Sequence, residues 1–215
     1  MKKIYFILFI IVAFFSFSSC NDEWKEEQYS HYVSFKAPLN DKGVTQINVR
    51  YKAEGKVTYQ LPLIVSGSTT NNSNLTVHVA VDPDTLQTLN YERFQNRTDF
   101  YYKELESRFY SMPETATIPA GENTSVMDID FTLKDIDLSD KWVLPLTIVD
   151  DPSYDYKAHP RKHYRKALLR IVPFNDYSGI YSGTALKIFL RGYENEAPIV
   201  RSEIPTFVVD DSTIF

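Results

Sequence analysis

The sequence predicts an all-β protein, built as an antiparallel β-sandwich with a short helical insertion. Several segments alternate apolar and polar residues with a period of two, as half-buried strands do. Clusters of Gly, Pro, Asn and Asp separate these segments at short intervals. Helical spacing of apolar residues is confined to the region from Asp84 to Phe109. Together these three observations favour a sandwich over an α/β or a helical fold.

The expected strands are short and follow one another through most of the chain. They cover residues 32–35, 44–51, 57–65, 75–81, 115–118, 126–133, 142–149 and 164–172. About seven to eight strands of this kind are typical of one sandwich domain. Leu61-Pro62-Leu63 is repeated as Leu144-Pro145-Leu146 in a later strand. Proline cannot donate to a sheet ladder, so Pro62 requires an edge position or a bulge, and the repeat predicts a similar position for Pro145.

Two helices are expected between the strands at 75–81 and 115–118. Asp84 is a suitable N-cap for a helix that continues to Phe94. A second helix is predicted after the capping residues Thr98 and Asp99. Its apolar face would consist of Tyr102, Leu105 and Phe109, which recur at helical spacing.

The N-terminus has the pattern of a bacterial lipoprotein signal. Lys2 and Lys3 precede the continuous apolar run Ile4–Phe17, which is too short for a comfortable membrane span. Small residues then lead into Cys20, the single cysteine, although Phe17 departs from the usual leucine. We therefore assign 1–19 to a lipoprotein signal peptide and expect lipid attachment at Cys20, with the membrane as partner. A plain secretory signal before an incidental cysteine is the alternative.

The segment 20–29 reads as an acidic, flexible tether. Acidic residues directly after a lipidated cysteine resemble the surface-export signal of Bacteroidetes lipoproteins. This resemblance implies an outer-membrane, lipid-anchored protein that faces the cell surface. A solvated linker without an export role is the alternative.

Composition and motifs exclude several function classes. The net charge is −5 and no basic block is present, which argues against nucleic acid as a partner. The sequence contains no GxSxG, HExxH or P-loop motif. We therefore expect no enzyme activity and no cofactor.

Two groups of residues are candidates for ligand binding. The first is a Tyr-rich loop with Tyr154, Tyr156, His159 and Tyr164. Sugars stack their apolar faces on aromatic rings while neighbouring polar groups bind their hydroxyls, so this loop is a candidate glycan site. Packing of these rings against a second domain is the alternative. The second group, Asp135, Asp137 and Asp140, has the alternating oxygens of a calcium loop, but a solvated loop is the better interpretation.

The segments 111–122 (SMPETATIPAGE) and 142–151 (WVLPLTIVDD) resemble a Bacteroidetes family of surface lipoproteins of unknown function. The preceding VHVAVD and YYKEL segments fit the same pattern. The resemblance implies an adhesin-like, immunoglobulin-like N-terminal domain, which also precedes family-18 glycosidase domains. The segment 173–189 (PFNDYSGIYSGTALKIF) resembles the start of the lipocalin-like C-terminal domain found in other members.

These observations divide the chain into four parts and lead to one main functional hypothesis. An immunoglobulin-like sandwich domain is expected at 30–173, and the incomplete first part of a lipocalin-like domain at 174–215. The expected function is a non-catalytic surface protein that binds or presents glycans in a glycan-utilisation system, alongside other outer-membrane uptake proteins. An adhesin-like spacer module and the accessory part of an endo-glycosidase are the alternatives.

Overall fold

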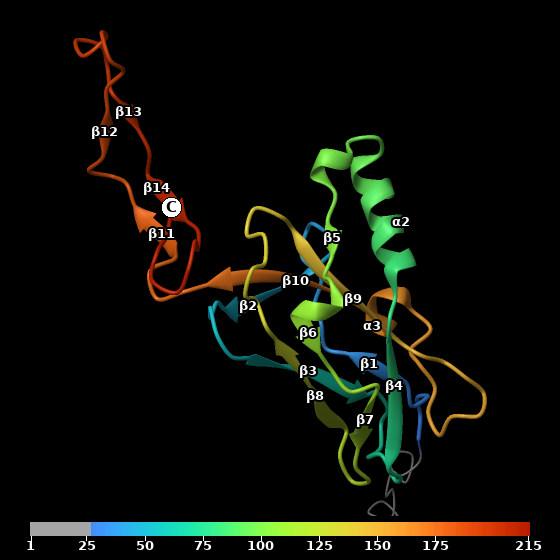
Figure 1. Ribbon diagram of the computed structural model, residues 1–215. Helices are drawn as coiled ribbons and strands as arrows, with labels where there is room; N and C mark the ends of the chain where they lie inside the picture. The colour runs from blue at the N-terminus through green and yellow to red at the C-terminus, as the bar shows by residue number, and fades with distance from the viewer. Residues whose placement is uncertain (1–26) are drawn as a thin grey trace, which may run out of the picture.

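The computed structural model describes residues 27–215, which form two packed β-sheets and a C-terminal arm (Figure 1). Within this range the α-helices are few and short, and strands dominate. The predicted all-β sandwich fold is therefore confirmed. The predicted signal peptide and the lipid site at Cys20 lie outside the described residues.

The smaller sheet has four strands in the order β1-β3-β8-β6. These strands are β1 (Val33–Phe35), β3 (Val57–Val65), β8 (Thr124–Phe131) and β6 (Tyr110–Ser111). All of their pairings are antiparallel, as predicted. The predicted alternation in and after β8 is also confirmed, because Met127, Ile129, Phe131 and Leu133 are all buried. This face of the sheet therefore points into the sandwich.

The larger sheet has the order β2-β10-β9-β4-β7, with β5 paired to β9. Its strands are β2 (Thr45–Arg50), β10 (Lys166–Phe174), β9 (Trp142–Ile148), β4 (Leu75–Val81), β7 (Thr115–Ile118) and β5 (Lys103–Glu104). Two pairings depart from the predicted antiparallel arrangement, since β2 pairs with β10 and β5 with β9 in parallel. The partners in each parallel pair are far apart in sequence, as parallel pairing requires.

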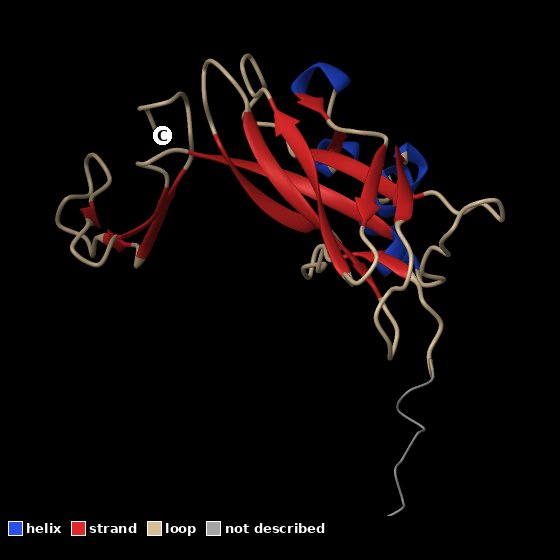
Figure 2. Cartoon of the chain, turned by 90° about the horizontal axis from the view of Figure 1, so that it is seen from below, coloured by secondary structure: helices blue, strands red, loops and turns tan. Residues whose placement is uncertain are grey.

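The main hydrophobic core lies between the two sheets, whose layers are visible edge-on in Figure 2. Each sheet contributes alternate apolar residues, so the core is continuous from one sheet to the other. Its fully buried side chains include Leu61, Leu63, Ile129, Phe131, Leu144 and Leu146.

Pro62 and Pro145 occupy equivalent places, as the repeated Leu-Pro-Leu segments predict. In each case the neighbouring strand ends beside the proline. The Pro62 carbonyl accepts from the Lys36 N–H at 2.9 Å, one residue beyond β1. The Pro145 carbonyl accepts from the Asp82 N–H at 3.0 Å, one residue beyond β4. Each proline therefore lies where the neighbouring strand has just ended. Its missing N–H does not interrupt a strand ladder at this position.

The first predicted helix is present as α2 (Pro83–Phe94), but its cap is Asp82 rather than Asp84. The Asp82 carboxylate accepts from the Thr85 N–H at 3.3 Å, and Pro83 fills the first helical turn. A second, smaller apolar cluster holds the helix against β9 and β10. It consists of Val44, Leu86, Tyr102, Val143 and Leu168.

The prediction of a second helix is wrong. Residues 98–111 form two 3₁₀ turns, η2 (Thr98–Phe100) and η3 (Ser107–Phe109), which flank β5. The buried Asn90 side chain bonds the backbone N–H and C=O of Tyr102, both at 2.9 Å. This contact and the pairing of β5 with β9 take up the backbone groups that a helix would use. Tyr102 therefore packs below α2, whereas Leu105 and Phe109 enter the main core.

The strand predicted at 164–172 begins and ends later than expected. Residues 162–165 form the short helix α3 (Lys162–Arg165), and β10 continues through Pro173 to Phe174. Pairing with β2 explains this extension, because Phe174 lies opposite Arg50 in the parallel ladder. The Tyr51 N–H also donates to the Phe174 carbonyl at 2.8 Å.

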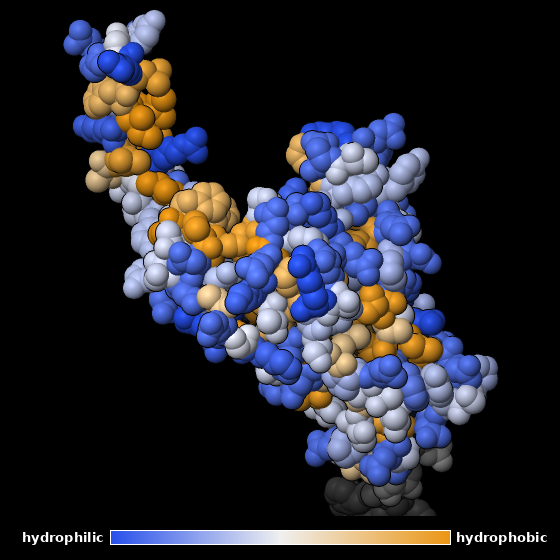
Figure 3. Space-filling model, viewed as in Figure 1, coloured by the Kyte–Doolittle hydropathy of each residue, from blue (hydrophilic) through white to orange (hydrophobic). Residues whose placement is uncertain are grey.

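The C-terminal arm follows β10 and extends away from the sandwich (Figures 1 and 2). It contains β11 (Gly179–Ser182), β12 (Lys187–Ile188), β13 (Ile199–Val200) and β14 (Glu203–Thr206). These strands pair as β11 with β14 and β12 with β13. Figure 3 shows apolar side chains on the surface of the arm, and the exposed ones include Ile180, Phe189, Leu190, Val200 and Phe215.

Asn175 joins the arm to the sandwich. Its buried side chain donates to the carbonyls of Asp210 and Thr213 at 2.9 and 3.1 Å. Asp176 also forms an ion pair with Arg50 of β2 at 2.6 Å. The Asn175 bonds therefore hold the end of the arm against its start, and the Asp176 ion pair ties that start to β2.

We expect Leu144→Ala to lower the free energy of unfolding by about 2–5 kcal/mol, because the substitution leaves a cavity in the main core. Chemical denaturation of the soluble protein measures this change. Val126→Ala is the matched control, since Val126 is 49% exposed on β8. A similar loss in both variants would contradict the assignment of the core.

Candidate functional site

Tyr156 anchors the loop formed by residues 149–160 to the larger sheet. Strand β9 ends at Ile148, and one more hydrogen bond to β4 follows, from the Val149 N–H to the His78 carbonyl at 2.9 Å. The Tyr156 hydroxyl replaces the opposite bond of this pair, because it accepts from the His78 N–H at 3.0 Å. The same hydroxyl donates to the Val149 carbonyl at 2.7 Å. Two backbone groups at the end of the ladder are thereby satisfied by one side chain.

This position gives Tyr156 a structural role besides the predicted ligand-binding one. Its side chain is 6% exposed and belongs to the main core, and it lines the hollow described below from its inner side. Burial is also the main reason why the pKa of its phenol is raised. Tyr156 therefore supports the loop, and its role in ligand binding stays a prediction.

Tyr154 is the aromatic residue of the loop that remains partly accessible. Its ring stacks on the His78 imidazole, with centroids 4.1 Å apart and an angle of 9° between the planes. It also lies 5.5 Å from the Tyr156 ring. Among the described residues, the buried Nδ1 atom of His78 has no hydrogen-bond partner. The stacking contact with His78 therefore fixes one face of the Tyr154 ring.

His159 and Tyr164 belong to a separate aromatic cluster. The His159 ring lies 5.4 Å from Tyr32 and 4.6 Å from Tyr164. Its Nδ1 atom accepts from the Arg161 N–H at 3.0 Å. Burial, together with Arg161 and His163, lowers the pKa of His159, so the imidazole is neutral at neutral pH. The four predicted ligand residues are therefore divided between two clusters.

A hollow of about 560 Å³ lies beside this loop and is lined by both aromatic and charged residues. We call it the loop hollow and define it by Tyr32, Asp150, Asp151, Tyr154 and Lys157. Hydrogen bonds from the Ser153 N–H and hydroxyl lower the pKa of Asp151, which is therefore an ionised acceptor. Asp150 lies 3.6 Å from the Arg165 guanidinium. Aromatic rings next to fixed polar groups are the combination that sugar binding requires.

The structure does not bring the calcium candidates together as a metal site. Asp140 is paired with Lys103 at 2.6 Å, and the Asp137 carboxylate accepts from Ser139. Asp135 precedes both in the same loop and has a positive φ of 60°. In residues 27–215 no group of three or more His, Cys, Asp or Glu side chains is arranged to hold a metal ion.

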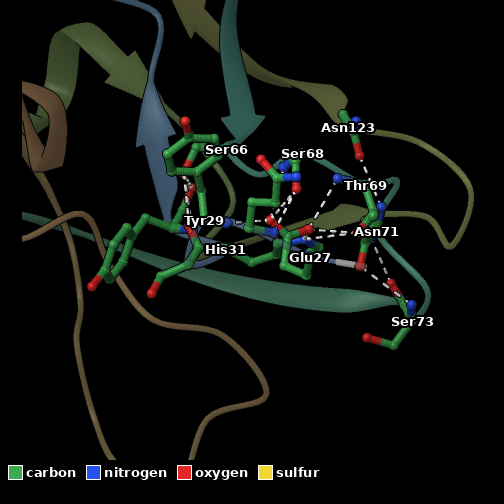
Figure 4. Close-up of polar contacts among 12 residues, drawn as sticks. Glu27, Tyr29, His31, Ser66, Ser68, Thr69, Asn71, Ser73 and Asn123 are labelled. Carbon is green, nitrogen blue, oxygen red and sulfur yellow. Dashed lines mark hydrogen bonds and ion pairs between the residues drawn. The ribbon is translucent and has the colours of Figure 1, made fainter. Parts of the chain in front are cut away.

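The N-terminal end of the described chain is docked on the sandwich through Glu27 (Figure 4). Its carboxylate accepts from the N–H groups of Ser68 and Thr69 at 2.8 and 3.0 Å, and from both hydroxyls. His31 and the Tyr29 N–H complete the contacts. These hydrogen bonds, led by that from the Ser68 N–H, hold the pKa of Glu27 far below its ordinary value.

This contact modifies the prediction of a flexible tether over 20–29, since Glu27 and Gln28 contact the segment after β3. Neither Tyr32 nor the Glu27 contact was identified by sequence reasoning. A lone tyrosine in a strand and a glutamate in an acidic run carry no signal of their long-range partners.

In residues 27–215 no helix is long and apolar enough to cross a membrane.

The fold and the loop hollow define a β-sandwich protein with a surface hollow and a C-terminal arm. Residues 24–152 match the model of a family described as a domain of unknown function (DUF4973), and the chain belongs to this family. A second family model, described as C-terminal, matches residues 165–215. No curated protein matches the sequence significantly.

Several solved Bacteroides structures are similar to this chain. A Bacteroides ovatus protein of unknown function is 51% identical, with a TM-score of 0.71, and the match covers 86% of this chain and 61% of that protein. A Bacteroides thetaiotaomicron protein described as an auxiliary nutrient binding protein is 46% identical, with a TM-score of 0.69 and coverage of 87% and 64%. This chain therefore spans about three fifths of the length of these relatives. They confirm a Bacteroides family of uncharacterised proteins, and no catalytic family is matched.

We expect Tyr156→Phe to lower the free energy of unfolding by about 1–3 kcal/mol, because it leaves the His78 N–H and the Val149 C=O without their partner. Thermal and chemical denaturation measure the loss. Tyr177→Phe is the control, since Tyr177 is 52% exposed on the arm. Equal stability of Tyr156→Phe and the native protein would contradict the anchoring role.

We expect Glu27→Gln to increase the hydrogen-exchange rates of the Ser68 and Thr69 amides, while Glu54→Gln leaves them unchanged.

The lowered pKa of Glu27 also predicts a pH dependence. The contact contributes fully above the ordinary glutamate pKa of 4.5 and is lost only as the pH falls well below it. The protection of these amides is compared with their intrinsic exchange at each pH. Protection that is already lost as the pH falls from neutral to 4.5 would be inconsistent with this contact.

Proposed function

We propose that this protein is a non-catalytic surface protein that binds glycans as nutrients. The observation that carries the proposal is the loop hollow, where Tyr32 and Tyr154 lie beside Asp150, Asp151 and Lys157. A sugar ring can pack its C–H face on a tyrosine while its hydroxyls bond to carboxylate and ammonium groups. The relative described as an auxiliary nutrient binding protein supports this function.

The proposal includes attachment of the chain to the outer membrane through a lipid on Cys20. Glu27 docks the N-terminal end of the described chain at one end of the sandwich, while the arm leaves from the opposite end (Figures 1 and 2). An anchored chain of this shape would hold the arm away from the membrane. Other outer-membrane glycan-uptake proteins are the partners that this arrangement suits.

A spacer without ligand binding is the second candidate function, and the position of the arm favours it. The Asn175 and Arg50 contacts fix the base of the arm relative to the sandwich. The sandwich would then act as a support for whatever the arm carries. The third candidate, an accessory part of an endo-glycosidase, has no specific observation in its favour.

The binding function is tested by affinity electrophoresis of the soluble protein, starting after Cys20, in gels that contain single polysaccharides. Suitable gels contain neutral polymers (starch, mannan, galactan, xylan) and acidic ones (polygalacturonate, heparin). We expect retention by at least one polymer and an affinity loss of about tenfold or more in Tyr154→Ala, because a stacking surface is removed.

Tyr91→Ala is the matched control, since Tyr91 is 65% exposed on α2 and lies outside the loop hollow. Its retention should equal that of the native protein. A melting curve of Tyr154→Ala separates lost binding from lost folding. Absence of retention on every gel would reject the binding function and leave the spacer function.

The lipid anchor is tested separately by labelling cells with radioactive palmitate. The native chain should incorporate the label, and Cys20→Ala should not. Because the soluble form starts after Cys20, its binding of polysaccharides is measured independently of the anchor. Label that persists in Cys20→Ala would reject the anchor.

A further inference from the structure

A second hollow shares Tyr154 with the loop hollow. It measures about 550 Å³ and lies at the sandwich edge formed by β4, β6 and the segment that leads to β7. We call it the edge hollow and define it by His78, Tyr110, Ser111, Met112, Glu114 and Tyr154. Tyr154 therefore belongs to the walls of both hollows.

The edge hollow offers the same kind of chemistry as the loop hollow. Burial and the charge of Glu104 raise the pKa of Tyr110, so its phenol is neutral and available as a donor at neutral pH. Ser111 and Glu114 are exposed and supply a hydroxyl and a carboxylate. Met112 and the rings of Tyr110 and Tyr154 supply apolar surface. A sugar unit would thus find both stacking and hydrogen-bonding groups here.

The size of the two hollows indicates an extended ligand. Each lies within the range of about 300–1,000 Å³ that is usual for a complete small-molecule site. Because both are lined by Tyr154, a chain of linked sugars that passes this residue would occupy both, whereas a monosaccharide would fill only one. Tyr154 would then lie at the centre of the bound chain, where an aromatic anchor contributes most.

The charges around the two hollows select against acidic ligands. Glu114, Asp150 and Asp151 line them, and Lys157 is the only lysine or arginine among these lining residues. Arg165 offsets part of the charge of Asp150 from 3.6 Å. An excess of carboxylates repels uronate and sulfate groups, while the hydroxyls of neutral sugars are good donors to carboxylates.

We infer that the ligand is a linear oligosaccharide of neutral sugars that crosses Tyr154 and occupies both hollows. This inference rests on the proposed function and specifies its ligand class. It assigns the edge hollow as a second subsite, with Glu114 as the acceptor for sugar hydroxyls at that end.

The test uses the polysaccharide that the gels retain most strongly, cut into oligosaccharides from disaccharide to hexasaccharide. Calorimetric titration of the soluble protein should show affinity rising about tenfold or more with length before it levels off. Glu114→Gln should weaken the longest oligosaccharide by about tenfold, since it removes a charged acceptor, and leave the shortest one that binds unchanged. Glu122→Gln, an exposed carboxylate outside both hollows, is the control.

The outcomes separate this inference from the proposed function. Affinity that is independent of length, or Glu114→Gln equal to native protein with the longest oligosaccharide, overturns the second subsite while the binding function stands. Strongest retention on polygalacturonate or heparin overturns the neutral ligand class. Failure of every polysaccharide to bind overturns both the inference and the proposed function.

Discussion

The arrangement of the candidate site depends on the place where β9 leaves the side of β4. The last bond between the two segments runs from the Val149 N–H to the His78 carbonyl, and the His78 N–H would be left without a partner in a partly buried position. The Tyr156 hydroxyl fills this gap and passes a hydrogen bond to the Val149 carbonyl. An unsatisfied backbone group of this kind costs about 1–3 kcal/mol. Satisfying the His78 N–H therefore fixes the position of the loop relative to β4.

That fixed loop determines what is available for binding. With Tyr156 buried, its neighbour Tyr154 stacks on His78 and lies between the loop hollow and the edge hollow. Asp150 and Asp151 follow the end of β9 directly, so the same turn places their carboxylates beside Tyr154. The site thus consists of a rigid aromatic anchor with charged groups around it, which is the arrangement that limits the entropy lost on binding.

Local patterns in the sequence were sufficient to predict most strands and the buried face of β8, because both follow the period of two. The helix predicted over Tyr102, Leu105 and Phe109 failed, since Asn90 and β9 bind this backbone from elsewhere in the chain. The Tyr-rich loop was recognised by composition, but the separation of Tyr156 from Tyr154 was not. Two tyrosines separated by one residue in a loop have the same local signal, and only the end of β9 decides which one is buried.

The most direct test of the account observes the ring of Tyr154 while a ligand binds. NMR spectra of protein with labelled tyrosine rings are recorded during titration with an oligosaccharide from the most strongly retained polysaccharide. The account predicts that the Tyr154 resonances shift most, followed by Tyr32 and Tyr110, while Tyr91 on α2 remains unchanged. Shifts confined to the tyrosines of the arm, with Tyr154 unaffected at saturation, would contradict it.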